Sequence, residues 1–398
     1  MSLLLLLLVA LSLAYLLSEI CKHIYVPRVV GQILGGILIG AFAKGYFTQD
    51  ALSSFSSLAD VGIVLLFFFT GFEVNLQEFR RHFKNSILIS VFNTTIPFVL
   101  GVLLSYSLGF GPATSVVIGI CLAVSSTAIS IDFLEEFKLL KSKVGNIIVT
   151  TGTVDDFLEL IFISVVVTYL QVSIGGGSLE SLGIGMLAFI GIAVILRFLV
   201  LPFVLDVIQK EHSHAGLFMI ALILTLLMAS FADYLGLGTL IGALIAGVIV
   251  RHSLLKQPTR KPWESHEISQ TMHAVSFGFL VPIFFVWVGL NTDLASILSN
   301  PILTIGLTLI AIVGTVVGTA LAIRYEKGSW EEGMLVGWGV TAKGDVELVV
   351  ASLALKNNLI TQEIFSALII MAFATTLIAP IVFRRMIKQK AALKSAMK

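Results

Sequence analysis

Long apolar runs separated by short polar breaks fill almost the whole chain. A helix needs about 20 apolar residues to cross the roughly 30 Å hydrocarbon core of a bilayer, so each run of that length predicts a spanning helix. The pattern therefore predicts an all-α polytopic membrane protein with about 13 transmembrane helices. The predicted spans are 2–20, 27–44, 52–73, 85–108, 112–135, 143–171, 182–208, 214–232, 236–250, 271–290, 301–324, 332–355 and 362–383.

The composition supports this assignment and excludes several other classes. Of 398 residues, 57% are hydrophobic and only 12% are charged, far from the balance of a soluble domain. No basic segment with a cleavage site precedes the first run, which indicates a spanning helix rather than a removable signal. A net charge of +1 offers no basic domain to nucleic acid, and two cysteines are too few for a disulfide framework or metal cluster. The expected surroundings are membrane lipids.

Basic residues alternate between the loops. Lys and Arg follow every odd-numbered run, whereas the loops after even-numbered runs carry only Lys44 and Lys356. Loops rich in Lys and Arg remain on the cytoplasmic side of a membrane. The chain is therefore predicted to be a multi-pass protein of the plasma membrane, with its N-terminus outside and its C-terminus in the cytoplasm.

Two pairs of runs are similar to each other. LFFFTGFEVNL (66–76) matches FFVWVGLNTDL (284–294), aligning Gly71 with Gly289, and GQILGGILIG (31–40) matches GALIAGVIV (242–250). Seven runs separate the members of each pair, so the two copies cross the membrane in opposite senses, as in many secondary transporters. We expect one transmembrane transporter unit over 1–398, without a soluble regulatory domain. It comprises a first inverted repeat (1–171), a linker helix (172–213) and a second repeat (214–398).

The same alignment pairs two runs that contain polar residues in their middle. AVSSTAIS (123–130) is rich in hydroxyls, and GVTAKGDVEL (339–348) contains Lys343, Asp345 and Glu347. Both are predicted to be broken helices that cross near the bilayer midplane, with Ser125 opposite Lys343. Unwound backbone supplies carbonyl oxygens and helix-end dipoles to an ion. The three charges of the second segment either pair with one another or form a second functional cluster.

Adjacent carboxylates lie in the sixth run, within TGTVDDFLEL (151–160). A charge near the bilayer centre costs about 2.5–3.5 kcal/mol, so Asp155 and Asp156 require a role there. Carboxylate oxygens suit Na⁺ or Li⁺, and the same group can instead hold a proton. Competition of the two ligands for one site is sufficient for coupled exchange. Glu159 either takes part or forms a structural ion pair.

Six segments together resemble the membrane domain of the monovalent cation/proton antiporter superfamily, on its bacterial and archaeal sodium/proton branch with a double-aspartate motif. This resemblance covers nearly the whole chain. It implies a 13-helix fold, a core domain that moves against a dimerisation domain in elevator-like alternating access, and a homodimer. The segments are VPRVVGQILGGILIG (26–40), LLFFFTGFEVNL (65–76), SSTAIS (125–130), TVDDFLEL (153–160), IFFVWVGLNTDL (283–294) and KGDVELVVA (343–351).

The resemblance also implies roles for individual residues. Asp156 would be the principal carrier of ion and proton, and Asp155 its partner; both would be ligands of the metal ion Na⁺. Ser125, Ser126 and Thr127 would contribute hydroxyls and backbone to the site. No cofactor is expected besides the transported Na⁺ (or K⁺) and H⁺, and the protein is not expected to be an enzyme.

One position departs from the family pattern. Members with two adjacent aspartates commonly carry a lysine that pairs with the first of them, on the helix equivalent to 301–324, whereas this chain has Thr315 there. Asp155 without that partner is expected to hold a proton or the cation itself. The stoichiometry would change accordingly, to one proton per ion.

Other functions are compatible with parts of this pattern. A K⁺/H⁺ antiporter shares every feature above, although glutathione-gated potassium efflux relatives usually show Gln-Asp and append a nucleotide-binding domain, which favours Na⁺ here. An intramembrane aspartyl protease needs a Gly-x-Gly-Asp setting, whereas the sequence reads Ala342-Lys343-Gly344-Asp345. A channel fits a duplicated core with two broken helices less well than alternating access does.

Overall fold

The computed structural model describes residues 2–23, 26–73, 76–156, 158, 179–200, 214–255, 273–295 and 301–396. These ranges are helices joined by short connections, and no strand occurs within them. Each of the 13 predicted spans coincides with helical residues there. The all-α class is confirmed, whereas the number of membrane crossings and the two-repeat division remain predictions.

The described residues form two compact units, each of which combines segments from both halves of the chain. Unit 1 lies within 1–11, 46–74 and 162–287, and unit 2 within 12–45, 75–161 and 288–398. Helices α1 (Leu3–His23) and α13 (Val281–Leu290) contribute to both. The remaining helices of unit 1 are α3 (Gln49–Glu73), α8 (Leu179–Ile195), η2 (Leu196–Val200), α10 (His214–Tyr234), α11 (Thr239–Leu255) and η3 (Ser276–Leu280).

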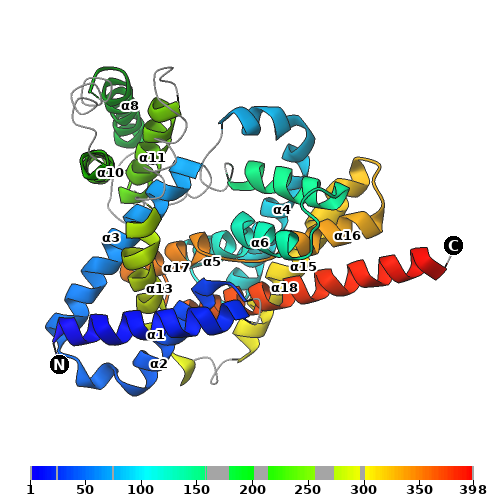
Figure 1. Cartoon of the computed structure of the whole chain (residues 1–398), viewed down its shortest axis with the longest axis horizontal. Helices are drawn as coiled ribbons and strands as arrows, with labels where there is room; N and C mark the ends of the chain where they lie inside the picture. The colour runs from blue at the N-terminus through cyan, green and yellow to red at the C-terminus, as the bar shows by residue number, and fades with distance from the viewer. Residues whose placement is uncertain are drawn as a thin grey trace. The chain divides into compact units, whose positions relative to one another are not determined.

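Unit 2 contains most of the polar positions that the sequence singled out. Its α15 packs along α4 and α16, and α17 packs on α5 and α18 (Figure 1). The helices of unit 2 are α2 (Arg28–Phe42), α4 (Leu76–Ser107), α5 (Pro112–Ala123), α6 (Thr127–Glu136), a helix over residues 143–156, α15 (Pro301–Tyr325), α16 (Trp330–Gly339), α17 (Val346–Lys356) and α18 (Gln362–Ala396); the short turn η1 (Lys44–Tyr46) follows α2.

Both predicted breaks are present in unit 2. The chain is unwound over residues 124–126, between α5 and α6, and over residues 340–345, between α16 and α17. The two unwound segments touch, because the Ser126 amide donates a hydrogen bond to the Ala342 carbonyl (2.9 Å). A Cβ on Gly344 would lie 2.5 Å from the Ser126 Cβ, so this close approach requires glycine.

The aligned glycines make equivalent helix contacts. In unit 1, a Cβ on Gly71 of α3 would overlap the Leu244 carbonyl oxygen of α11. In unit 2, a Cβ on Gly289 of α13 would overlap the Ile33 carbonyl oxygen of α2. Small residues allow such close helix packing in membranes. The two aligned glycines thus have the same packing role in α3 against α11 and in α13 against α2, while the inverted repeat stays a prediction.

Replacing one of these glycines should therefore destabilise the fold. For Gly289→Val we expect a loss of at least about 1–3 kcal/mol, since the added side chain meets backbone that cannot move aside. Thermal melting of the purified protein measures the effect. Gly191→Val on α8 is the matched control, because a Cβ there meets nothing within 4 Å. Equal melting temperatures for the two variants would contradict the packing described above.

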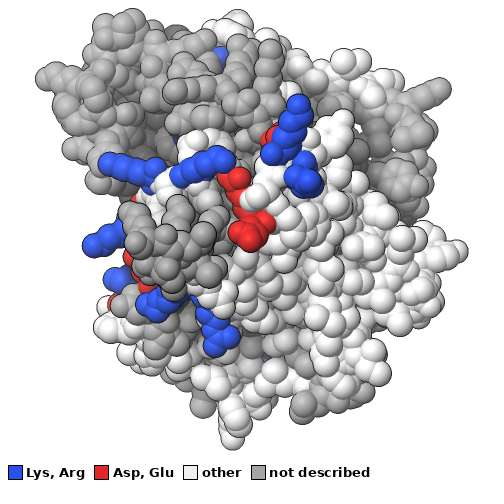
Figure 2. All heavy atoms as spheres, turned by 90° about the vertical axis from the view of Figure 1, so that its right-hand side faces the viewer, with Lys and Arg blue, Asp and Glu red and all other residues white. Residues whose placement is uncertain are grey.

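The described surface is that of a membrane protein. Six helices are long and apolar enough to span a bilayer, and five shorter apolar helices accompany them in the described ranges. Large apolar side chains are widely exposed, as for Leu4, Leu187 and Ile302, each more than 70% accessible. On the face drawn in Figure 2 the charged side chains leave a broad uncharged area at the lower right. Extensive apolar exposure of this kind suits contact with lipid.

Candidate functional site

Asp155 is held inside unit 2 by neutral hydrogen-bond donors. Its carboxylate is fully buried; the Ser90 hydroxyl donates to Oδ1, and Asn93 Nδ2 donates to Oδ2 at 2.8 Å. Ser90 and Asn93 are three residues apart on α4 and so share one face of that helix. Because a buried carboxylate is costly unless its oxygens are bonded, these two contacts fix the Asp155 side chain.

Asp156 lies against the first break. It is half-buried, and its Oδ1 accepts a hydrogen bond from the Thr127 hydroxyl at 2.6 Å. Thr127 is the first residue of α6, where unpaired amide groups give the helix end a partial positive charge that favours a carboxylate. One turn before Asp156, a Cβ on Gly152 would lie 2.5 Å from Thr127 Cγ2. Glycine at that position lets α6 approach the carboxylate.

The second break brings a buried cation to the same region. Lys343 is 1% exposed, and its Nζ donates to the Ala123 carbonyl, at the end of α5, over 3.5 Å. The Lys343 carbonyl accepts from the Thr376 hydroxyl of α18. The ammonium interacts electrostatically with both Asp155 and Glu347. It therefore offsets the negative charges of Asp155 and Glu347. It also offsets the partial negative charge at the C-terminal end of α5.

Glu347 is the least satisfied of the buried acids. It is 2% exposed in the first turn of α17, and neither carboxylate oxygen makes a hydrogen bond in the described part of the chain. Its backbone carbonyl accepts from Cys121 Sγ of α5 at 3.7 Å. Asp345 is half-exposed at the N-cap position of α17, where its side chain caps no amide. The two acids thus have different surroundings despite their proximity in sequence.

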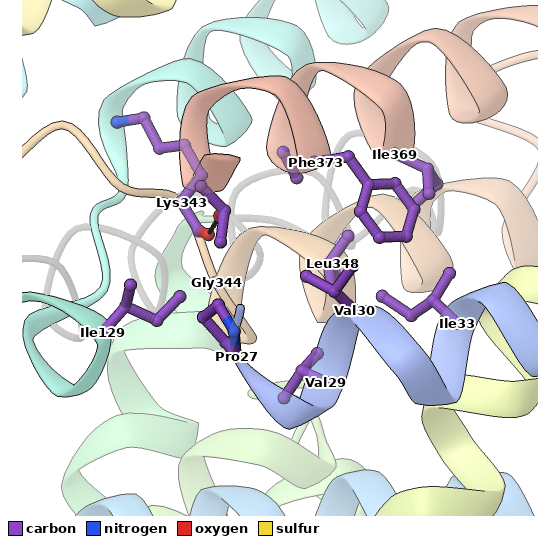
Figure 3. Close-up of a pocket in the computed structure, with 12 residues that line it drawn as sticks. Pro27, Val29, Val30, Ile33, Ile129, Lys343, Gly344, Leu348, Ile369 and Phe373 are labelled. Carbon is purple, nitrogen blue, oxygen red and sulfur yellow. Dashed lines mark hydrogen bonds between the residues drawn. The ribbon is translucent and has the colours of Figure 1, made fainter. Parts of the chain in front are cut away.

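An apolar pocket lies beside the second unwound segment, on the side away from the Lys343 ammonium (Figure 3). Figure 3 shows Lys343 and Gly344 at this pocket, with the Lys343 side chain pointing away from the apolar side chains. This lining provides almost no ligand for an ion. The lining residues are Pro27, Val29, Val30, Ile33, Ile129, Lys343, Gly344, Leu348, Ile369, Ala372, Phe373 and Thr376.

The structure brings together most of the residues predicted from sequence. Asp155, Asp156, Lys343 and Glu347 lie around the two breaks, as described above. Ser125 and Ser126 are buried in the first unwound segment beside Thr127. Thr315 is buried on α15, which packs along α4. Glu159 lies outside the described residues.

Two site residues were missed by the sequence reasoning. Ser90 and Asn93 lie in the predicted span 85–108, and both bond to Asp155. The available signal was their spacing, since polar residues three apart in an apolar helix share a face. Nothing in the local sequence indicates which neighbouring helix that face meets.

Together these features define a class of protein. Two broken helices touch at their unwound segments, a third helix places Asp156 against one break and the adjacent Asp155 against α4, and a buried lysine lies in the other break. Intramembrane charges at discontinuous helices mark the ion sites of secondary transporters. The fold and site are therefore those of an ion-coupled membrane transporter.

The chain belongs to the sodium/hydrogen exchanger family, whose transmembrane model matches residues 7–389. It is 26% identical to the Na(+)/H(+) antiporter of Enterococcus hirae, over 94% of each chain. It is 24% identical to the Na(+)/H(+)-K(+) antiporter GerN of Bacillus cereus, over 89% of this chain and 88% of that protein. The sodium proton antiporter MjNhaP1 of Methanocaldococcus jannaschii has the same fold, with a TM-score of 0.63 at 18% identity over 95% of both chains.

These comparisons confirm the family that the sequence motifs indicated. They make the chain a cation/proton antiporter rather than an enzyme, with a monovalent cation and a proton as its transported substrates.

Proposed function

We propose that this protein exchanges Na⁺ or Li⁺ for H⁺, with cation and proton competing for Asp156. The observation that carries this proposal is the half-buried Asp156 carboxylate at the first break, held through one oxygen by Thr127. A carboxylate at this position can hold either a proton or a cation. A proton neutralises the carboxylate and a bound cation also neutralises it, so the two exclude each other.

The groups that would hold the cation are hard oxygen donors. They are the Asp156 carboxylate, the Thr127 hydroxyl and the unwound backbone at Ser125 and Ser126. Asp155 supports the site, because neutral donors occupy both of its oxygens and Lys343 supplies an opposite charge. Oxygen ligands of this kind suit an alkali cation better than a soft metal.

We further propose elevator-like alternating access in a homodimer, within the plasma membrane and with the C-terminus in the cytoplasm. All the described residues assigned to the site belong to unit 2. A rigid movement of that unit would therefore carry the complete site without rearranging its ligands.

The proposal is tested by proton movement in proteoliposomes that hold an imposed pH gradient. Addition of Na⁺ or Li⁺ should dissipate the gradient, and choline should not. A response to K⁺ alone would establish the second candidate, K⁺/H⁺ exchange, which the similarity to the Na(+)/H(+)-K(+) antiporter GerN favours. If no cation dissipated the gradient at any pH tested, both candidate functions would be contradicted.

The charge balance of exchange gives a further prediction. Because Thr315 and the donors that bond Asp155 on α4 are neutral, and the buried Lys343 interacts with Glu347 as well as with Asp155, we propose an electroneutral cycle of one proton per ion. In Thr315→Lys a fixed ammonium is added on α15, which packs along α4, and exchange should become sensitive to membrane potential. Currents on a solid-supported membrane measure this, with Thr315→Met as the neutral control of similar length. An unchanged response to potential in Thr315→Lys would contradict the proposed charge balance.

A further inference from the structure

On α4 and α15, five buried side chains present oxygens that make no hydrogen bond in the described part of the chain. One is Thr304, near the start of α15; the other four are Asn93 Oδ1 and the hydroxyls of Thr94, Thr315 and Thr319, and each of these four residues is at most 8% exposed. Other hydroxyls on the same helices do donate to a backbone carbonyl, as Thr308 does to the Thr304 carbonyl at 2.8 Å. We call these four residues the polar seam.

The four residues lie in one helix crossing. A Cβ on Gly314 would lie 2.8 Å from the Pro97 Cα, and a Cβ on Gly318 would lie 2.6 Å from the Phe92 carbonyl oxygen. The α4 members of the seam lie between Phe92 and Pro97, and the α15 members directly follow the two glycines. The four residues therefore lie next to the backbone contacts of the two helices.

The chemistry of the seam selects its ligand. Leaving a buried donor or acceptor unpaired costs about 1–3 kcal/mol, so four in one crossing require a partner. The three threonine hydroxyls each have a proton to donate, whereas Asn93 Oδ1 can only accept. Water accepts from hydroxyls and donates to an amide oxygen, and it is stable where two to four polar partners surround it. A monovalent cation would leave the hydroxyl protons unmatched.

We propose that the polar seam binds ordered water, and that this water positions Asp155 through Asn93. Asn93 connects the two, because its Nδ2 donates to Asp155 while its Oδ1 belongs to the seam. Water bound at Oδ1 keeps the amide from rotating and so keeps its N–H directed at Asp155. Asn93 is thus a positioning residue. The consequence for transport rests on the proposed function; the water site does not.

Hydroxyl-radical footprinting tests the water site, because radicals formed from a bound water oxidise the side chains beside it. Pro97 is buried against Gly314 and serves as the reporter, read by mass spectrometry of the intact protein in lipid. We expect oxidation of Pro97 in the wild type, a several-fold loss in Thr315→Val, and no loss in Thr308→Val, whose hydroxyl is already bonded. Absence of Pro97 oxidation in the wild type, or equal oxidation in Thr315→Val, would overturn the water site.

Exchange kinetics on the same proteins test the positioning role. Thr315→Val should lower the maximal exchange rate about tenfold, as loss of a supporting hydrogen bond around a ligand typically does. The apparent KM for Na⁺ should be unchanged, and Thr315→Ser should restore the rate. A wild-type rate in Thr315→Val with Pro97 oxidation lost would overturn the positioning role and leave the water site intact. A failure of the proposed function is distinguishable, because then the wild type exchanges no cation while its Pro97 oxidation persists.

Discussion

Asp156→Asn is expected to reduce cation-dependent proton movement to background while leaving a folded protein. Asparagine keeps the size of the side chain, and its Oδ1 can still accept the hydrogen bond from Thr127. It cannot bind a proton or neutralise a cation, which are the two events that exchange requires. Because Asp156 is half-buried rather than fully buried, we expect the asparagine variant to fold. The measurement is gradient dissipation by Na⁺ in proteoliposomes, with thermal melting as the check of folding.

Two further variants sharpen this result. Thr127→Val removes the hydroxyl that bonds Asp156 and should weaken exchange without abolishing it, whereas Thr127→Ser should preserve it. Wild-type exchange in Asp156→Asn would remove Asp156 from the site and direct attention to Asp155. An unfolded Asp156→Asn would instead indicate that the carboxylate has a structural role.

The second large effect is expected from Lys343→Met. Methionine has a similar length but no charge, so Asp155 and Glu347 lose the buried cation with which they interact. Removing one member of a buried charge arrangement typically destabilises a protein by about 3–5 kcal/mol. A marked fall in melting temperature should follow. Lys388→Met, at an exposed position on α18, is the control and should melt like the wild type.

A double variant separates charge compensation from lost packing. Adding Glu347→Gln to Lys343→Met removes a negative charge that had lost its counterpart, and part of the lost stability should return. Strictly additive losses would indicate that Lys343 does not offset Glu347. An unaltered melting temperature in Lys343→Met alone would mean that its charge has no structural role.

The sequence by itself determined the class of fold and indicated most residues of the candidate site. Hydropathy identified the helices because a bilayer leaves the backbone no alternative to internal hydrogen bonding. The charged segment at Lys343 predicted one break, since charges are costly in an intact apolar helix, and its alignment with the hydroxyl cluster near Ser125 predicted the other. Adjacent aspartates in a third helix predicted the ion site for the same reason.

Only the tertiary structure decided which side chains complete the site. Ser90 and Asn93 bond to Asp155 from residues more than 60 positions away in sequence, and Lys343 reaches the end of α5 across 220 positions. Hydropathy reports how each residue partitions between water and lipid, which is a local property. Which helix faces which depends on close packing at small residues such as Gly314 and Gly318, and the direction of each contact exists only once the helices have met.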